Sequence, residues 1–215
     1  MNTRRTKQSG FTLIEIAVVL VIVGLLIGGI MKGQEMINSG KVKNLGQDLR
    51  NAGTFAMSYQ DKFRALPGDD ASVVDHVRGT VATTGGTAGN GRIEGDWNSS
   101  LDTEESFLFW QHIRLAGLAN GTTVTSSTQY TPRNPNGGPI GVTGTPPITN
   151  WAGSLFSCTS GITGAVARQL DTMMDDGNTN SGSVRVVASG AAATGAGVAL
   201  TPANDADQYT LCMAI

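Results

Sequence analysis

The sequence has few charged residues and only two cysteines. Charged residues make up 15% of the 215 residues, and 15 basic against 17 acidic side chains leave a formal charge of −2. Without an excess of basic residues, no overall electrostatic field indicates a nucleic-acid partner. Two cysteines exclude a small domain held together by several disulfides, and the 40% share of apolar residues excludes a chain that is disordered throughout.

The local signatures of common catalytic sites are also absent. The sequence contains no H-E-x-x-H, G-x-S-x-G, S-x-x-K, C-x-x-C or G-x-G-x-x-G motif. The two histidines, His76 and His112, stand in unrelated contexts. Glu104 and Glu105 are adjacent, so their side chains point in different directions and suit the first turn of a helix better than an acid/base pair. We therefore expect a protein that is not an enzyme and that needs no cofactor.

Positive charge is concentrated at the start of the chain. Arg4, Arg5 and Lys7 lie within the first ten residues, with no acidic residue among them. The remaining residues carry 12 basic and 17 acidic side chains. A basic start followed by an acidic body indicates that the two parts face different compartments.

A long apolar segment follows this basic start. It runs for 21 residues from Phe11 to Met31, interrupted by Thr12 and Glu15. At about 1.5 Å per residue, a helix of this length just spans a ~30 Å hydrocarbon layer. Because the positive residues precede the segment, we expect the short N-terminus to stay in the cytoplasm and the rest of the chain to cross the membrane.

An acidic side chain within such a segment requires a partner. Glu15 would cost on the order of 3 kcal/mol at the bilayer centre and less near an interface. Either it reaches headgroups and water near the cytoplasmic end, or it pairs with a cation inside an assembly. The small residue that suits proteolytic cleavage is Gly10, in front of the segment, and a cut after it would supply such a cation as the free amine of Phe11.

The segment Ser9-Gly10-Phe11-Thr12-Leu13-Ile14-Glu15 resembles the prepilin cleavage and methylation motif of type IV pilins and type II secretion pseudopilins. The resemblance covers about the first quarter of the chain. It implies that a prepilin peptidase, which is also a methyltransferase, cuts between Gly10 and Phe11 and methylates the Phe11 amine. It also implies that Glu15 pairs with the Phe11 amine of an adjacent subunit during filament assembly.

The resemblance implies a function and a location. We expect a structural subunit of a type IV pilus-like filament, held first in the bacterial inner membrane and later in a periplasmic or extracellular filament. Its expected partners are the lipid bilayer, an inner-membrane assembly platform, the prepilin peptidase, and other pilins or pseudopilins in a homopolymer or a mixed filament. One alternative is a pseudopilin of a type II secretion system, whose short filament acts as a periplasmic piston. A rival from another class is a binding protein anchored by an uncleaved helix.

Beyond Met31 the chain stays compatible with a helix up to Pro67. Apolar residues recur there at spacings of three and four, which is a seam of period 3.5. The seam consists of Val42, Leu45, Leu49, Ala52, Ala56, Tyr59 and Phe63. We therefore divide the chain into a leader at 1–10, a long helix at 11–66 that spans the membrane over about 11–33, and a globular head at 67–215.

The composition of the head indicates an α+β fold. In the pilin-like arrangement that we expect, an antiparallel sheet packs across the second, amphipathic half of the long helix. Asp102 or Thr103 is expected to cap a helix that runs through Leu118. A further helix is expected at 162–174, and strands are expected at 183–189 and 208–215. The stretch 121–150 contains five of the seven prolines and is expected to be a long surface excursion with at most short strands.

Two features of the head bear on its chemistry. An even pair of cysteines in an exported domain favours a disulfide between Cys158 and Cys212, and the alternative is two buried free thiols. A loop with four oxygen-bearing side chains has the composition of a calcium site: Asp175, Asp176, Asn178 and Asn180. Its spacing does not match an EF-hand, and clusters of Asp, Asn and Gly are more often turns, which is the interpretation that we favour.

Overall fold

The computed structural model describes residues 11–189 and 195–215. Its elements, in chain order, are α1 (Leu13–Phe63), α2 (Val73–Val77), α3 (Glu105–Leu115), β1 (Ile140–Thr143), β2 (Phe156–Thr163), α4 (Gly164–Met174), β3 (Val184–Ala188), the 3₁₀ helix η1 (Pro202–Asn204) and β4 (Gln208–Ala214). The chain is therefore α+β, as its composition predicts. It divides into two compact units, residues 1–40 and 41–215, which are described separately.

In the first unit, α1 is an apolar helix with exposed side chains. Every large apolar side chain from Phe11 to Ile37 is exposed, and the helix continues without a break through Lys32 and Glu35, which form an ion pair of 2.7 Å. By length and composition α1 qualifies as a helix that could cross a membrane. Such a surface is unstable in water and requires lipid or other apolar helices around it.

In the second unit, the C-terminal half of α1 forms part of the core. The seam from Val42 to Tyr59 is at most 3% exposed, and Phe63 is half-buried, so the predicted period of 3.5 is confirmed. The helix ends at Phe63 because Arg64 adopts a left-handed conformation (φ +59°), which is a common helix termination. Pro67 also disfavours helix at Leu66, so α1 is shorter than the expected helix at 11–66.

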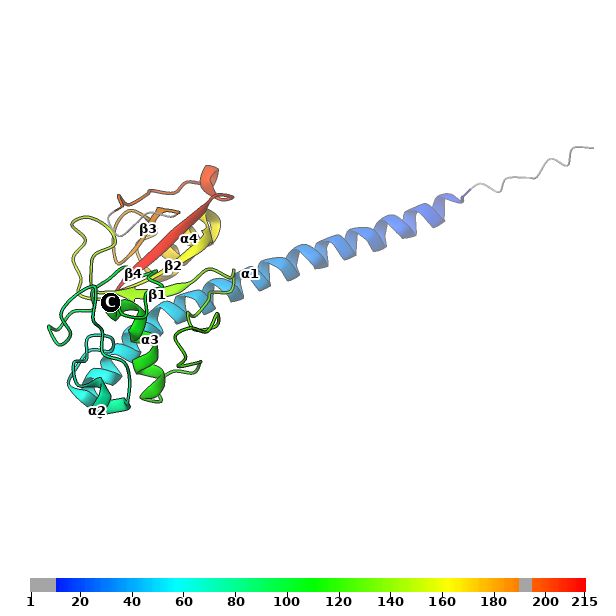
Figure 1. Ribbon diagram of the computed structural model, residues 1–215. Coiled ribbons are helices and arrows are strands. Elements are labelled where there is room, and N and C mark those ends of the chain that lie inside the picture. The colour runs from blue at the N-terminus through cyan, green and yellow to red at the C-terminus, as the bar shows by residue number, and fades with distance from the viewer. Residues whose placement is uncertain (1–10, 190–194) are drawn as a thin grey trace, which may run out of the picture. The chain divides into compact units, whose positions relative to one another are not determined.

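The four strands form one antiparallel sheet in the order β1-β2-β4-β3 (Figure 1). Strand β4 pairs with both β2 and β3, whereas β1 and β3 are the edges. The register between β2 and β4 shifts between Thr159 and Ile162, and Gly161 lies in this shift with φ +70°. This is a β-bulge, in which a glycine supplies the left-handed residue.

Both faces of the sheet are buried because side chains alternate along each strand. Leu211 and Met213 of β4 belong to the main core, together with α1, α3 and α4. Cys212, between them, belongs to a second cluster in which Trp97 and Trp151 from long loops cover the opposite face. The sheet is thus sandwiched between helices and ordered loops, which gives the head a core on each side.

Several elements differ from the sequence-based expectations. Helix α3 begins at Glu105 with Glu104 in the N-cap position, in place of the expected Asp102 or Thr103, and it ends at Leu115. Ile162 belongs to β2, a strand that the sequence did not indicate. The stretch 121–150 is partly buried, since Tyr130 packs on Phe107 and donates its hydroxyl to the Phe107 carbonyl at 2.9 Å.

Candidate functional site

The start of α1 is organised by a reciprocal pair of hydrogen bonds. The Thr12 N–H donates to Glu15 Oε2 at 2.7 Å, and the Glu15 N–H donates to Thr12 Oγ1 at 3.3 Å. The Thr12 hydroxyl also donates to Oε2, at 2.7 Å. This is a capping box, in which the residue before the helix and the third helical residue satisfy each other's N–H groups. The T-x-x-E spacing is the sequence signal for this cap, and it was not among the sequence-based expectations.

The capping box fixes where the Glu15 carboxylate lies. Both hydrogen bonds that the carboxylate accepts end on Oε2. Among residues 11–189 and 195–215, no donor reaches Oε1. The neighbouring Phe11 is 85% exposed, so both members of the predicted assembly pair lie on the surface of the helix end. The predicted cleavage residue, Gly10, lies outside the described residues. The geometry leaves Glu15 able to accept a cation while it caps its own helix.

The two cysteines of the head form a disulfide. Cys158 and Cys212 face each other on β2 and β4, with a Cα–Cα distance of 4.0 Å, and both are fully buried. The bond crosses the two inner strands on the face that Trp97 and Trp151 cover. Such a bond is typical of proteins that fold in an oxidising compartment.

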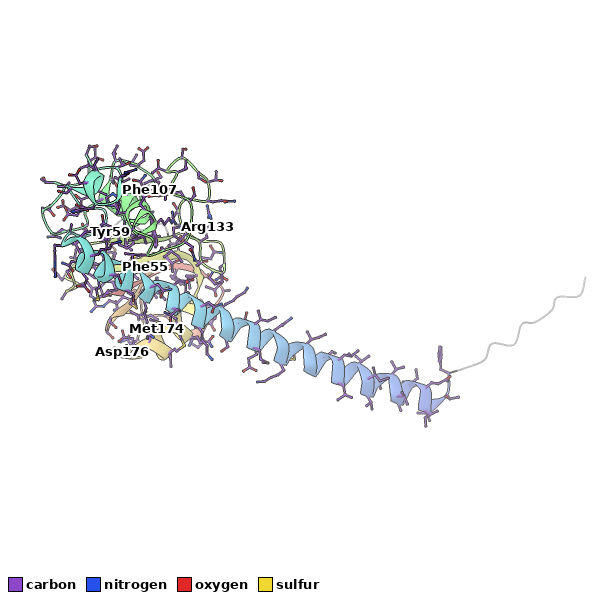
Figure 2. The ribbon with its side chains drawn as sticks, turned by 90° about the horizontal axis from the view of Figure 1, so that it is seen from below. Phe55, Tyr59, Phe107, Arg133, Met174 and Asp176 are labelled. Carbon is purple, nitrogen blue, oxygen red and sulfur yellow. A yellow bond between two sulfur atoms is a disulfide. The ribbon has the colours of Figure 1, made fainter. Side chains whose placement is uncertain are left out.

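The acidic loop after α4 brings together a set of residues that only partly matches the sequence-based candidate. Asp175 and Asp176 lie next to Asp171 of α4, with one oxygen of each within 4.8 Å of the others. Asn178 and Asn180 take part in a turn, in which Asn178 Oδ1 accepts the Asn180 N–H at 3.3 Å. Asp171 lies in the last turn of α4, and Asp175 is the residue that follows the helix, four positions later. In Figure 2 the labels of Met174 and Asp176 mark this end of α4.

Asp171 is unusual among the acidic residues of the head. It is fully buried, and its carboxyl group lies beside the backbone N–H of Gly177 and the carboxyl groups of Asp175 and Asp176. Burial, together with the charges of Asp175 and Asp176, raises the pKa of Asp171 to about 6.

Two adjacent aspartates tie the end of α1 to the following loops. Asp69 accepts three backbone N–H groups, from Gly89, Asn90 and Gly91, and it is 2% exposed. Asp70, which is 1% exposed, accepts the Tyr59 hydroxyl at 2.7 Å and contacts a nitrogen of His76 at the same distance. Burial and this bond to Asp70 raise the pKa of Tyr59. These aspartates act as structural anchors and are not simple turn residues.

Two further titratable residues, His112 and Glu105, lie on α3 and are buried. His112 accepts the Gly68 N–H at Nδ1 (2.8 Å), and its Nε2 lies 2.8 Å from the Thr80 carbonyl. Burial lowers the pKa of His112, so a neutral ring joins two loops to α3. Glu105 is also fully buried, and it accepts the Glu94 N–H at 2.7 Å through Oε2. Glu105 lies in the first turn of α3, as expected, but its side chain is fully buried.

Comparison with known proteins adds one positive finding. The family model described as the prokaryotic N-terminal methylation motif matches residues 5–31. No curated protein and no solved structure matches the chain. The matched residues include the basic start, Phe11, the capping pair and the apolar part of α1. The chain therefore carries the signature of type IV prepilins and pseudopilins, joined to a head with a pilin-like α+β fold.

Proposed function

We propose that this protein is a structural subunit of a type IV pilus-like filament. In this proposal the chain is inserted in the inner membrane as a prepilin, cleaved after Gly10 and methylated at Phe11. It then leaves the membrane and polymerises through α1. The observation that carries the proposal is the exposed apolar surface of α1 from Phe11 to Ile37, together with the methylation motif over residues 5–31.

The apolar surface of α1 has to be kept out of water. In the membrane, lipid covers it, and in a filament the same helices of neighbouring subunits would cover it. Glu15 is the one charged residue between Phe11 and Met31, and a carboxylate in an apolar bundle requires a cation. The amine of Phe11 in an adjacent subunit supplies that charge at the same end of the helix. The proposed role of the protein is mechanical and not catalytic.

The N-terminal sequence of the protein in two cell fractions tests the proposal. Mass spectrometry is applied to filaments released from the cell surface by shear and to washed membranes. A peptide that begins at methylated Phe11 in the sheared fraction supports a pilus subunit. The same peptide found only in membranes favours a pseudopilin of a type II secretion system. An intact leader that ends at Gly10 in both fractions contradicts processing and favours an anchored binding protein.

A pair of matched substitutions tests the role of Glu15. Glu15→Gln removes the charge but keeps the shape, and we expect it to abolish sheared filaments while the protein remains in the membrane. Glu35→Gln removes the same charge farther along the exposed side of α1, where Glu35 pairs with Lys32 in the same helix. We expect this control to assemble normally. Normal assembly of the Glu15 variant would refute the proposed pairing.

A further inference from the structure

Three asparagines of the head are each followed by a glycine, which makes them chemically alike. The Asn-Gly pairs stand at 90–91, 120–121 and 136–137. All three lie outside the helices and strands, and all three asparagines are exposed. In such a pair the backbone nitrogen of glycine can attack the side-chain amide carbon of asparagine, because glycine has no side chain to hinder the approach. The three pairs differ in what holds the glycine nitrogen.

Hydrogen bonds restrain two of the three pairs. The N–H of Gly91 donates to Asp69 Oδ2 at 2.7 Å. The asparagine of the same pair is also held, because its side-chain N–H donates to Glu94 Oε2 at 2.8 Å. The N–H of Gly137 donates to the Asn134 carbonyl at 2.8 Å. In both pairs, attack by the glycine nitrogen first requires its hydrogen bond to break, which adds to the activation barrier.

The pair at 120–121 has neither restraint. Within the part of the chain that the structure describes, the Gly121 N–H donates to no acceptor and the Asn120 side chain makes no hydrogen bond. Both residues are exposed, so water reaches the glycine nitrogen and can accept its proton. The Gly121 nitrogen is therefore able to attack the Asn120 side chain without breaking a contact of the fold.

A buried cation lies against this pair. Arg114 of α3 is 9% exposed, and a side chain at Gly121 would begin only 2.6 Å from its Nε. Arg114 Nη1 donates to the carbonyls of Thr122 and Tyr130, at 2.9 and 2.7 Å. Among the described residues no ion pair includes this arginine. A neighbouring cation stabilises both an amide nitrogen that loses its proton and a carboxylate that is formed, so Arg114 favours the reaction at both stages.

We propose that Asn120 is a site of spontaneous deamidation in the folded head. The Gly121 nitrogen bonds to Cγ of Asn120, and the side-chain nitrogen leaves as ammonia, carrying the proton of the glycine N–H. Water then opens the succinimide ring at either of its carbonyls, which gives aspartate or isoaspartate. Only water is consumed and only ammonia is released, so the net change is the replacement of an amide by a carboxylate.

The new carboxylate changes the charge of a pocket between α1 and α3. The pair at 120–121 and Arg114 line this open pocket of about 490 Å³, with Asp48 of α1 on another wall. Deamidation places a negative charge beside the Arg114 guanidinium and gives this buried cation an ion-pair partner. Heads that differ in age therefore differ in the charge of this surface. The same chemistry is expected whether the protein serves a pilus or a secretion system.

Peptide mass spectrometry of the full chain, aged in detergent micelles at neutral pH, tests the proposal. The fraction of aspartate plus isoaspartate is followed at each pair, in native protein and in protein unfolded by guanidinium chloride, with digestion at acidic pH. Unfolded chains lack the restraining hydrogen bonds, so we expect similar rates at all three pairs. In native protein we expect the pairs at 90–91 and 136–137 to slow at least about tenfold, the equivalent of one hydrogen bond. Asn120 is expected to keep its unfolded rate.

Two results would overturn the proposal. One is protection of Asn120 in native protein to the same degree as the other two asparagines. The other is deamidation of Asn90 or Asn136 in native protein as fast as that of Asn120. Either result would show that the hydrogen bond of the glycine nitrogen does not select the site.

Matched substitutions locate the reaction. Asn120→Gln keeps the amide but lengthens the side chain, and its exposed position preserves the fold. We expect it to abolish the acidic species that isoelectric focusing resolves in aged native protein. Asn136→Gln, at the exposed control pair, should leave that species unchanged. An acidic species that persists in Asn120→Gln and disappears in Asn136→Gln would assign the modification to the wrong pair.

The role of Arg114 is tested by introducing the product directly. Asn120→Asp places the carboxylate beside Arg114, and we expect a higher urea midpoint than in the unsubstituted protein, because the buried guanidinium gains a partner. Asn136→Asp adds the same charge at an exposed position and should leave the midpoint unchanged. A lower midpoint for Asn120→Asp than for Asn136→Asp would refute the stabilisation of the product by Arg114.

Discussion

The buried Glu105 makes the stability of the head depend on pH. Its side chain is fully buried at the start of α3, Oε2 accepts the Glu94 N–H at 2.7 Å, and Oε1 has no hydrogen-bond partner. Burial raises the pKa of Glu105 from 4.5 to about 7, and the nearby charges of Asp69 and Glu94 add to this rise. A difference of this size between the folded and unfolded states corresponds to about 3 kcal/mol.

The direction of the effect follows from proton binding. Between pH 4.5 and 7 the folded protein keeps the Glu105 proton, whereas the unfolded chain loses it. The free energy of unfolding therefore falls as the pH rises through this range, and the contribution of Glu105 is complete only below the unfolded pKa. Glu105→Gln is neutral at every pH and still accepts the Glu94 N–H. We expect it to match the unsubstituted protein near pH 4.5 and to exceed its stability by about 3 kcal/mol at pH 8.

Urea unfolding followed by tryptophan fluorescence measures this difference. All three tryptophans, Trp97, Trp110 and Trp151, lie in the second unit, so their emission reports on the head of the full chain in micelles. Glu104→Gln, at the half-buried neighbouring position, is the matched control and should run parallel to the unsubstituted protein. The quantity of interest is the difference between each variant and the unsubstituted protein, because other groups also titrate. A Glu105→Gln difference that stays constant from pH 4.5 to 8 would refute the reasoning.

Three further predictions concern the stability of the head, each measured by urea unfolding of the full chain. Replacing both Cys158 and Cys212 by Ala should cost about 4 kcal/mol, because the bond closes a loop with a sequence separation of 54, and an unchanged urea midpoint would contradict this. Asp69→Asn should cost about 2–4 kcal/mol, since an amide NH₂ cannot accept the N–H groups that Asp69 binds, and a loss below 1 kcal/mol would show that the anchor is dispensable. Leu49→Ala, which truncates a buried side chain of the seam, should lower the free energy of unfolding by about 2–5 kcal/mol. Met57→Ala, at an exposed position of the same helix, should change it by about 0.5 kcal/mol or less. Equal losses in the two variants would contradict the observed packing of the seam.

Most of α1 could be predicted from the sequence because the pattern that identifies it lies within the helix itself. An apolar seam of period 3.5 identifies the buried face of a helix without knowledge of what covers it, and the residues from Val42 to Tyr59 are buried as expected. The strand β4 was also predicted, from its continuous run of strand-forming residues. Its register and its partners depend on residues far away in the sequence, and these came only from the structure.

The strand β2 shows why other parts of the head could not be predicted. Its sequence, Phe-Ser-Cys-Thr-Ser-Gly-Ile-Thr, is rich in Ser, Thr and Gly and resembles a loop. Ser157 and Thr159 are nonetheless fully buried, and β2 is an inner strand that pairs with both β1 and β4. Asp171 is a similar case in the acidic loop after α4, since only the packing of α4 reveals that its carboxyl group is buried beside Asp175 and Asp176.

The place of β4 in the sheet constrains the time at which the head folds. The strand begins at Gln208, after every other element in the sequence, yet it lies between β2 and β3, and β3 pairs with no other strand. The sheet is therefore incomplete until residues 208–214 have been synthesised and can pair. Until then, the hydrophobic faces of β2 and β3 stay open to chaperones and proteases. The arrival of β4 and closure of the core thus become one event, which the Cys158–Cys212 bond then makes covalent.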